Sequence, residues 1–374
     1  MTSGKYYNAR LFLNWQLVLS RILLTGLIAT LLAACSTPTP QPTPTAIPLA
    51  KEINFYDWEE DMPQSILDAF TEEYSIKVNY FIYESQEEAI ANIQAGQIYD
   101  VVVMESRFIP QLVKENLLAE LDQRNLDNSK NLSANFRELA YDPGNHYSIP
   151  YNWGTTGLVV RSDLAAEPVT RWADLWDVRY AGRVGLWMGQ RREVISLTLK
   201  SLGYSANSED PAELEAALER LLELNSHVLT LEDFDLYTSI GVLNNAQAII
   251  TMGYASDALD GREQNPAITY VLPKEGALLW NDTFVIPANS PNKYTAELFL
   301  NFLMRADINA KIVNENLYAT PNEAAYPFIE ADIMNNAVIF PSNEDLVNAE
   351  LILPLSTQGQ QLYDEIWERF STAP

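Results

Sequence analysis

Two kinds of hydrophobic pattern alternate along the first part of the chain. Ile53–Asp57 is a short strand-like run, and Pro63 then stands where the first turn of a helix tolerates proline. Apolar residues recur every three or four positions after Pro63, which predicts a helix. Ile76–Ile82 alternates as a second strand, and Tyr99–Val103 is a continuous apolar run typical of a buried parallel strand.

Local signals mark further elements between and after these strands. Ser85 and Glu88 have the spacing of a capping box, and Gly96 is a plausible stop for the helix that they begin. Two strands are predicted at Ser148–Tyr151 and Gly157–Val160, around a loop at 152–156. Later elements are a helix with an apolar face at Leu214, Leu221 and Leu222, strands at 248–252 and 269–272, and a helix at 294–304. This alternation predicts an α/β architecture with largely parallel sheets.

The first 34 residues predict export from the cytoplasm. They carry Lys5, Arg10 and Arg21 and no acidic residue, and they end in an apolar run of 13 residues, 22–34. A basic start followed by a short apolar run is typical of a signal peptide, whereas a membrane span needs about 20 apolar residues. An uncleaved anchor helix that also uses residues 11–19 is the alternative.

The residues around the single cysteine extend this prediction. Leu32–Cys35 resembles the lipobox of bacterial lipoproteins, which implies that Cys35 is lipidated and that residues 1–34 are removed. Residues 35–50 alternate threonine and proline, so they form neither helix nor sheet and are predicted to be a semi-rigid tether. We therefore expect a protein anchored by lipid to the outer face of the cytoplasmic membrane.

Composition excludes several classes of function. The 374 residues carry a formal net charge of −26, which disfavours nucleic acid because phosphate-binding surfaces need clustered Lys and Arg. One cysteine and two histidines, His146 and His227, cannot build a disulfide within the chain or a Cys/His metal site. We predict no metal and no cofactor, because no glycine-rich phosphate loop or dinucleotide fingerprint is present.

Ten short strings, taken together, resemble the spermidine/putrescine-binding proteins of bacterial ABC importers. They are Tyr56–Trp58, Tyr99–Val103, Tyr147–Tyr151 with Trp153–Gly154, Thr170–Trp176, Arg192–Val194, Pro273–Gly276, Leu279–Asp282, Ile286–Asn289, Asn301–Leu303 and Tyr318–Asn322. The resemblance implies a type II periplasmic-binding fold, in which two α/β lobes of discontinuous chain close on a ligand by hinging. Lobe one is expected at 51–157 plus 282–326 and lobe two at 158–281 plus 327–374, with crossovers near Gly157 and Asn281.

The same resemblance implies a set of ligand-binding residues. Carboxylates balance the ammonium groups of a polyamine, and aromatic faces pack its methylenes and attract its charge. The positions that match the family pattern are Trp58, Glu60, Glu193, Trp280, Asp282 and Tyr318.

Four positions depart from the family pattern, and they bear on ligand length. Gln190 stands in place of an acid, and Met252 in place of a wall tryptophan, with Tyr254 two residues further on. Glu105 and Arg107 replace a serine and a tyrosine. Glu105 restores the negative charge that is lost at Gln190. Arg107 either neutralises that charge or faces away from the cleft. Because Gln190 and Met252 weaken the site for an additional amine, we expect putrescine to bind at least as tightly as spermidine.

The sequence thus predicts a monomeric substrate-binding lipoprotein that captures a small cationic ligand, a polyamine, and delivers it to the permease subunits of an ABC importer. No reaction is expected, because no activated nucleophile is visible. One alternative is an anionic or neutral solute organised by Arg107, Arg191 or Arg192. The other is a sensor or enzyme built on the same scaffold.

Overall fold

The computed structural model describes residues 47–59, 61–225, 227–229 and 236–373. Residues 49–374 form one unit, and the account below concerns that unit. Cys35, the predicted signal peptide, residues 35–46 of the predicted tether and Glu60 lie outside the described residues. Within the described ranges, every helix is too short or too polar to span a membrane.

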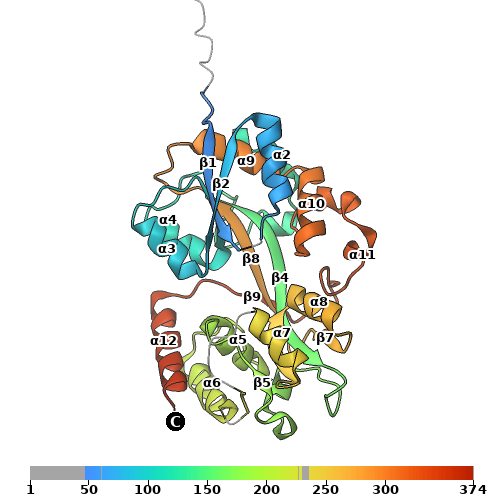
Figure 1. The fold of residues 1–374 in the computed structure, drawn as a ribbon. Helices are drawn as coiled ribbons and strands as arrows, with labels where there is room; N and C mark the ends of the chain where they lie inside the picture. Colours follow the sequence, from blue (N-terminus) through green and yellow to red (C-terminus); the bar gives the residue numbers. More distant parts are fainter. Residues whose placement is uncertain (1–46, 60, 226, 230–235, 374) are drawn as a thin grey trace, which may run out of the picture. The chain divides into compact units, whose positions relative to one another are not determined.

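A mixed sheet organises the unit (Figure 1). Its strand order is β2-β1-β3-β8-β4-β6-β5, and β7 and β9 pair with β4 and β8. The strands are β1 (Glu52–Trp58), β2 (Lys77–Tyr83), β3 (Val101–Glu105), β4 (Ser148–Arg161), β5 (Val184–Gly185), β6 (Ile250–Tyr254), β7 (Ile268–Val271), β8 (Leu278–Val285) and β9 (Glu350–Leu351). Four of the strand pairs in the described residues are parallel and four are antiparallel. The prediction of largely parallel sheets is therefore wrong, because β4 is antiparallel to β6, β7 and β8, and β8 is also antiparallel to β3.

Strand β4 is continuous where the sequence predicts a loop at 152–156. Strand β8 pairs with it from Asn152↔Asp282 to Thr156↔Leu278, so the backbone groups of this stretch are bonded within the sheet. The register shifts between Pro150 and Asn152, which is consistent with the missing N–H of proline. Figure 1 shows β4 and β8 running side by side through the middle of the unit.

Helices cover both parts of the sheet, and several begin as predicted. Ser85 caps α3 by accepting a hydrogen bond from the Glu88 backbone N–H, and Gly96 follows with a positive φ of 80°. Leu222 is 39% exposed and lies off the buried face of α6, contrary to the prediction. The α-helices are α2 (Gln64–Tyr74), α3 (Gln86–Gln94), α4 (Ile109–Lys114), α5 (Arg191–Ser201), α6 (Pro211–Leu224), α7 (Leu236–Asn244), α8 (Ala255–Gln264), α9 (Lys293–Leu303), α10 (Ala306–Asn316), α11 (Ala331–Met334) and α12 (Thr357–Ser371).

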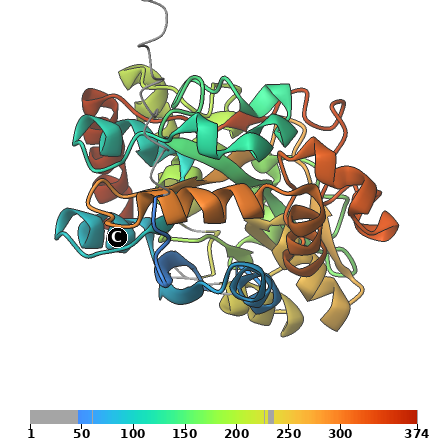
Figure 2. The same cartoon turned by 90° about the horizontal axis from the view of Figure 1, so that it is seen from above.

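Two large hydrophobic cores define two lobes. In lobe one, Phe70 of α2 packs edge-on against Phe299 of α9, with ring centroids 4.8 Å apart, and α9 is the orange helix seen along its length in Figure 2. In lobe two, the core gathers Trp172, Leu218 of α6 and Phe370 of α12. The core of lobe one contains residues from 53–151 and from 284–312. The core of lobe two contains residues from 158–278, between those two segments, and from the C-terminal part of the chain that includes α12. Each lobe is thus discontinuous in sequence.

One segment packs with a lobe other than the one expected for it. Ile329 and Phe340 share a hydrophobic cluster with Ala310 and Val313 of α10, and α10 packs against lobe one. Residues 327–340 therefore lie against lobe one, although the expected boundary assigns them to lobe two. The chain contacts lobe two again from Asn348, whose side chain donates to the Lys274 carbonyl, and it joins the core of that lobe at Ile352 and α12.

Candidate functional site

Four oxygen-bearing side chains lie in a row across adjacent strands. Glu105 of β3 is opposite Asp282 of β8, and Asp282 is opposite Asn152 of β4. Residues opposite each other in antiparallel strands project from the same face of the sheet, so these three side chains are neighbours. Asp61, after the end of β1, extends the row, because the Asn152 Nδ2 group donates to its Oδ1 at 3.3 Å. We call Glu105, Asp282, Asn152 and Asp61 the acceptor row.

Asp57 adds a carboxylate beside Asp61. It is fully buried near the end of β1, where it accepts hydrogen bonds from the Trp58 backbone N–H at 2.8 Å and from the Tyr80 hydroxyl at 3.3 Å. Burial, and then the neighbouring charge of Asp61, raises the pKa of Asp57 well above its usual range. Burial likewise raises the pKa of Asp61 to about 7.

Asp282 stands at the centre of the row. Burial raises its pKa well above the usual range, and the charges of Asp61 and Glu105 add to the shift. Interaction with the Trp58 side chain opposes the shift, which places that indole beside the carboxylate. The Trp58 ring also packs on Tyr83, with centroids 4.6 Å apart. Asp282 is therefore a buried acid with an aromatic wall next to it.

A cation is built into the other end of the row. The Arg107 Nε group donates to Glu105 Oε1 at 2.7 Å, and the guanidinium lies 4.5 Å from the Phe108 ring centroid. Burial acts to lower the pKa of Arg107, but the charges of Glu105 and Glu193 outweigh it and the pKa is raised. Arg107 therefore faces the site carboxylates and neutralises part of their charge.

Glu193 reaches this same group from lobe two, in the first turn of α5. It is 5% exposed, and burial, followed by the charge of Glu105, raises its pKa to about 7. Arg107 and Arg192 oppose that shift. Arg192 itself is held elsewhere, donating to Ser196, to the Ala206 carbonyl and to Asn207.

Four aromatic rings, contributed by both lobes, continue the site. Trp187, Tyr254, Trp280 and Tyr318 make successive edge-to-face contacts, with centroid distances of 4.7, 5.3 and 5.5 Å. Gly154 of β4 makes room for this line, because a Cβ there would lie 2.4 Å from the Trp280 ring. The negative faces of such rings attract cations, and their area packs methylene groups.

The structure brings together most of the residues singled out in the sequence. Gln190 directly precedes α5, and its backbone N–H donates to the Trp187 carbonyl at 3.0 Å. Met252 is fully buried in the lobe-two core, so it packs apart from the row. Glu60 lies outside the described residues. The residues that lie together are Trp58, Glu105, Glu193, Tyr254, Trp280, Asp282 and Tyr318.

Sequence reasoning missed Asp57, Asp61 and Asn152. The signal for the two aspartates is the acid-rich segment 57–61, in which four of the five residues are acidic and Trp58 is the exception. Asn152 gives no such signal, because its role follows from the pairing of β4 with β8.

Several buried polar atoms of the site have no hydrogen-bond partner among the described residues. Three are oxygens, Asp61 Oδ2, Asn152 Oδ1 and Glu193 Oε2, and one is the Trp280 indole N–H. A buried polar atom without a partner costs about 1–3 kcal/mol. The unpaired acceptors are spread from the acceptor row to α5, so the site suits an extended ligand that carries several N–H donors.

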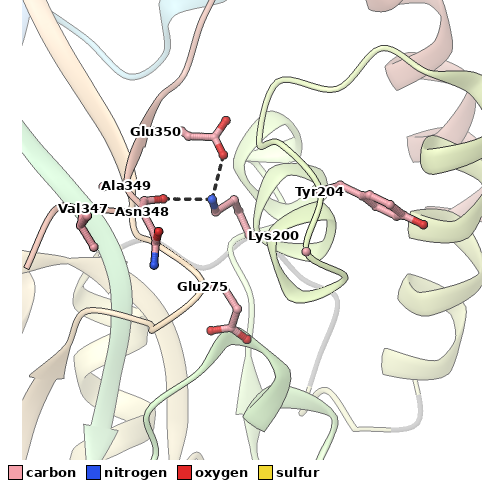
Figure 3. A pocket seen from close by; sticks show the side chains of 8 residues that line it. Lys200, Tyr204, Glu275, Val347, Asn348, Ala349 and Glu350 are labelled. Atoms are coloured by element: carbon pink, nitrogen blue, oxygen red, sulfur yellow. Dashed lines mark hydrogen bonds and ion pairs between the residues drawn. The ribbon is translucent and has the colours of Figure 1, made fainter.

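A pocket of about 470 Å³ lies away from these residues in lobe two (Figure 3). Its one lysine, Lys200, is already engaged by Glu350 Oε1 at 2.7 Å and by the Asn348 carbonyl at 3.0 Å. None of its lining residues belongs to the acceptor row, so we do not assign ligand binding to it. The lining residues are Lys200, Gly203, Tyr204, Glu275, Val347, Asn348, Ala349 and Glu350.

Comparison with known proteins places the chain in a family. Residues 65–341 match the family described as bacterial extracellular solute-binding protein. The chain is 34% identical over 319 residues to the spermidine/putrescine-binding periplasmic protein of Escherichia coli K12, covering 84% of this chain and 90% of that protein. It is 30% identical over 341 residues to the putrescine-binding periplasmic protein SpuD of Pseudomonas aeruginosa, covering 86% and 92%.

Solved structures agree with this assignment. The spermidine/putrescine ABC transporter substrate-binding protein PotD from Streptococcus pneumoniae superimposes with a TM-score of 0.78 at 28% identity, covering 86% of this chain and 99% of that one. A putative spermidine/putrescine ABC transporter protein from Listeria monocytogenes gives the same TM-score at 29% identity, with the same coverage. The two-lobed α/β fold predicted from the sequence is thereby confirmed. The chain belongs to the bacterial extracellular solute-binding protein family.

Proposed function

We propose that this protein is the substrate-binding component of an ABC importer and that its ligand is a polyamine of the putrescine and spermidine class. The protein catalyses no reaction; it delivers the ligand to permease subunits in the membrane. The relatives named for spermidine and putrescine binding support this ligand class.

The observation that carries the proposal is the set of buried carboxylates with unpaired oxygens beside a line of aromatic rings. Asp61 Oδ2 and Glu193 Oε2 are buried without partners among the described residues, and burial raises the pKa of each carboxyl to about 7. An ammonium group supplies both the missing donors and the missing charge. Trp280 and Tyr318 offer faces for the methylenes between the ammonium groups.

An anionic ligand fits the same site less well. Arg107 Nε is paired with Glu105, and the terminal nitrogens of Arg192 donate to Ser196, Ala206 and Asn207, so both guanidinium groups are partly engaged within the protein. An anion there would meet Asp282 and Glu193 as buried like charges, which is strongly unfavourable.

The two lobes close on the ligand by hinging about β4 and β8. Lobe one consists of 51–157 plus 282–326, joined by 327–340, and lobe two of 158–281 plus the C-terminal residues that include α12. The distribution of the hydrophobic cores supports these boundaries. Glu193 comes from lobe two and Asp282 from the strand that passes between the lobes, so closure brings the two carboxylates onto one ligand.

We test this function by calorimetric titration of the purified protein with a matched series of four-carbon ligands. Putrescine should bind, while butylamine, which keeps one ammonium, should bind at least tenfold more weakly. Succinate, which also has four carbons but carries two negative charges, should not bind. Spermidine should also bind, and each binding amine should raise the free energy of unfolding by about 2.7 kcal/mol when present at 100 times its Kd. Binding of succinate in preference to putrescine would overturn the proposal.

We further propose that the protein is a monomer, exported by the signal peptide at 1–34, anchored through lipid on Cys35 and held off the membrane by the tether at 35–50. The Cys35→Ala variant should leave ligand affinity unchanged and move the protein from the membrane fraction to the soluble fraction. If wild type and variant both remain with membranes, an uncleaved anchor helix explains the attachment instead of a lipid.

A further inference from the structure

The first turn of α5 carries Glu193 but lacks the usual cap. Gln190, the residue before the helix, makes no side-chain cap hydrogen bond to it. The first backbone N–H groups of a helix have no partners inside the helix, and a capping side chain normally fixes that turn. In α6, by contrast, the Asp210 side chain accepts from the Ala212 and Glu213 N–H groups. The turn that carries Glu193 is therefore held by other contacts.

Arg192, the residue before Glu193, makes such contacts. It is 7% exposed, and within α5 its guanidinium donates to Ser196 Oγ at 2.8 Å. Outside the helix the guanidinium donates to the Ala206 carbonyl at 3.0 Å and to Asn207 Oδ1 at 2.9 Å. These three acceptors are neutral, so the planar fork of donors determines the geometry of the contacts. Arg192 thus bonds the start of α5 to the loop that follows the helix.

Asn207 joins this guanidinium to the C-terminal part of the chain. Its Oδ1 atom also accepts from the Leu353 N–H at 2.8 Å, and its Nδ2 group donates to the Leu351 carbonyl at 2.9 Å. Leu351 ends β9, which pairs with β8 as far as Leu279, the residue before Trp280. The first turn of α5 is thereby bonded, through one arginine and one asparagine, to the segment that arrives from lobe one.

Tyr363 of α12 provides a second contact between Arg192 and the C-terminal residues. The Arg192 guanidinium lies 4.5 Å from the centroid of this ring, and the Tyr363 hydroxyl donates to the Ser208 carbonyl at 2.9 Å. The guanidinium is therefore held between the loop after α5 and α12. A lysine in its place would keep the positive charge, but a single ammonium nitrogen cannot reproduce the planar fork of donors.

We propose that Arg192 is a positioning residue for ligand binding: together with Asn207 it ties the uncapped first turn of α5 to the C-terminal segment and so holds Glu193 toward the ligand. This inference rests on the proposed function and deepens it, because its readout is the binding of an amine at Glu193. Arg192 acts through the placement of that carboxylate and not by contact with the ligand.

The test is calorimetric titration of the full chain with putrescine. Arg192→Lys should weaken binding by about fourfold although the charge is kept, because the turn that carries Glu193 loses its fixed position. Asn207→Ala, which breaks the tie from the other side, should weaken binding by about threefold. The double variant should weaken it by no more than about fivefold, because the effects of residues in one chain of contacts do not add.

A second background separates positioning from a general loss of stability. In Glu193→Gln, the further change Arg192→Lys should alter putrescine affinity by less than about 1.5-fold, because the carboxylate that Arg192 positions is gone. The matched control is Arg161→Lys. Arg161 is 8% exposed in the same lobe, and its guanidinium donates to the Leu243 and Asn244 carbonyls at 2.6 and 3.3 Å. This control should keep the affinity of wild type, and thermal unfolding should show that every variant is folded.

Three results would overturn the positioning role while leaving polyamine binding intact. They are equal losses for Arg192→Lys in wild type and in Glu193→Gln, additive losses in the double variant, and a loss no larger than that of Arg161→Lys. If Arg192→Lys does not fold, Asn207→Ala measured in the same two backgrounds decides between these outcomes. If wild type does not bind putrescine, the proposed function fails and the positioning role with it.

Discussion

The two ends of the acceptor row contain the same kind of residue in opposite electrostatic settings. At one end, Asp57 and Asp61 are buried next to Asp282. The charges of Asp61 and Asp282 raise the pKa of Asp57, and the charge of Asp61 raises the pKa of Asp282. At the other end, Glu105 and Glu193 share Arg107, whose guanidinium bonds directly to Glu105. Burial raises the pKa of Asp57, Asp61 and Glu193, but among the described residues a cation bonds to a carboxylate of the row only at Glu105.

The contrast shows how a site rich in carboxyl groups can be stable without a ligand and still bind a cation. An ion pair inside the protein offsets part of the desolvation of Glu105 and Glu193. The end without an arginine accepts protons in place of a cation, as the raised pKa of Asp61, about 7, indicates. We therefore expect ligand ammonium groups to gain most at the end of Asp61 and Asp282.

The largest effect on binding is expected from Asp282→Asn. The substitution keeps the shape of the side chain but leaves a buried ammonium without its counter-charge, which costs about 2–5 kcal/mol of binding free energy. Glu193→Gln makes the same change at the end that holds Arg107 and should cost less, about 1 kcal/mol. Calorimetry with putrescine measures both. A loss in Glu193→Gln equal to that in Asp282→Asn would remove the distinction between the two ends.

The sequence predicted the parts of this site that depend on single positions. Asp282 and Glu193 are recognisable because each stands in a string shared with a family, and both lie in the site's buried polar group. The strands and helices of lobe one follow from local periodicity, and each observed bound of β1, β2 and α9 differs from the predicted one by one residue.

What the sequence could not reveal depends on pairing between distant segments. The stretch 152–156 contains polar residues and a glycine that read as a loop, and only β8, more than a hundred residues later, makes it a strand. Asn152 enters the site for that reason alone. Likewise, Met252 matches the family's wall tryptophan by its place in the sequence. In the structure it lies on β6 and packs into the lobe-two core.

The dependence of stability on pH should be steeper than in a protein whose acids are exposed. Asp61 has a folded pKa of about 7 against an ordinary value of 3.8, and Glu193 about 7 against 4.5. Between the two values the folded state binds more protons than the unfolded state, so stability falls as pH rises through this window. We expect ligand-free protein to lose up to roughly 3 kcal/mol per group between pH 5 and pH 8.

Chemical unfolding at pH 5 and pH 8 measures this loss and locates it within the row. Asp61→Asn should be more stable than wild type at pH 8 and closer to wild type at pH 5, because the group that takes up the proton is gone. Saturating putrescine should reduce the loss in wild type, since bound ammonium groups favour the ionised carboxylates. A flat profile in ligand-free wild type would contradict the burial of ionisable acids at this site.

Removing the internal cation should have a smaller effect than the change in pH and sharpens the comparison. Arg107→Gln deletes the guanidinium that bonds to Glu105 and should destabilise the ligand-free protein by about 2 kcal/mol. Spermidine should bind several-fold more tightly to this variant, because an ammonium group then meets Glu105 and Glu193 without a competing charge. Arg179→Gln is the matched control, since Arg179 also pairs with the acid two residues before it, Asp177, but on the surface. If Arg107→Gln instead binds spermidine more weakly, Arg107 supports the ligand rather than competes with it, and the two ends of the row act alike.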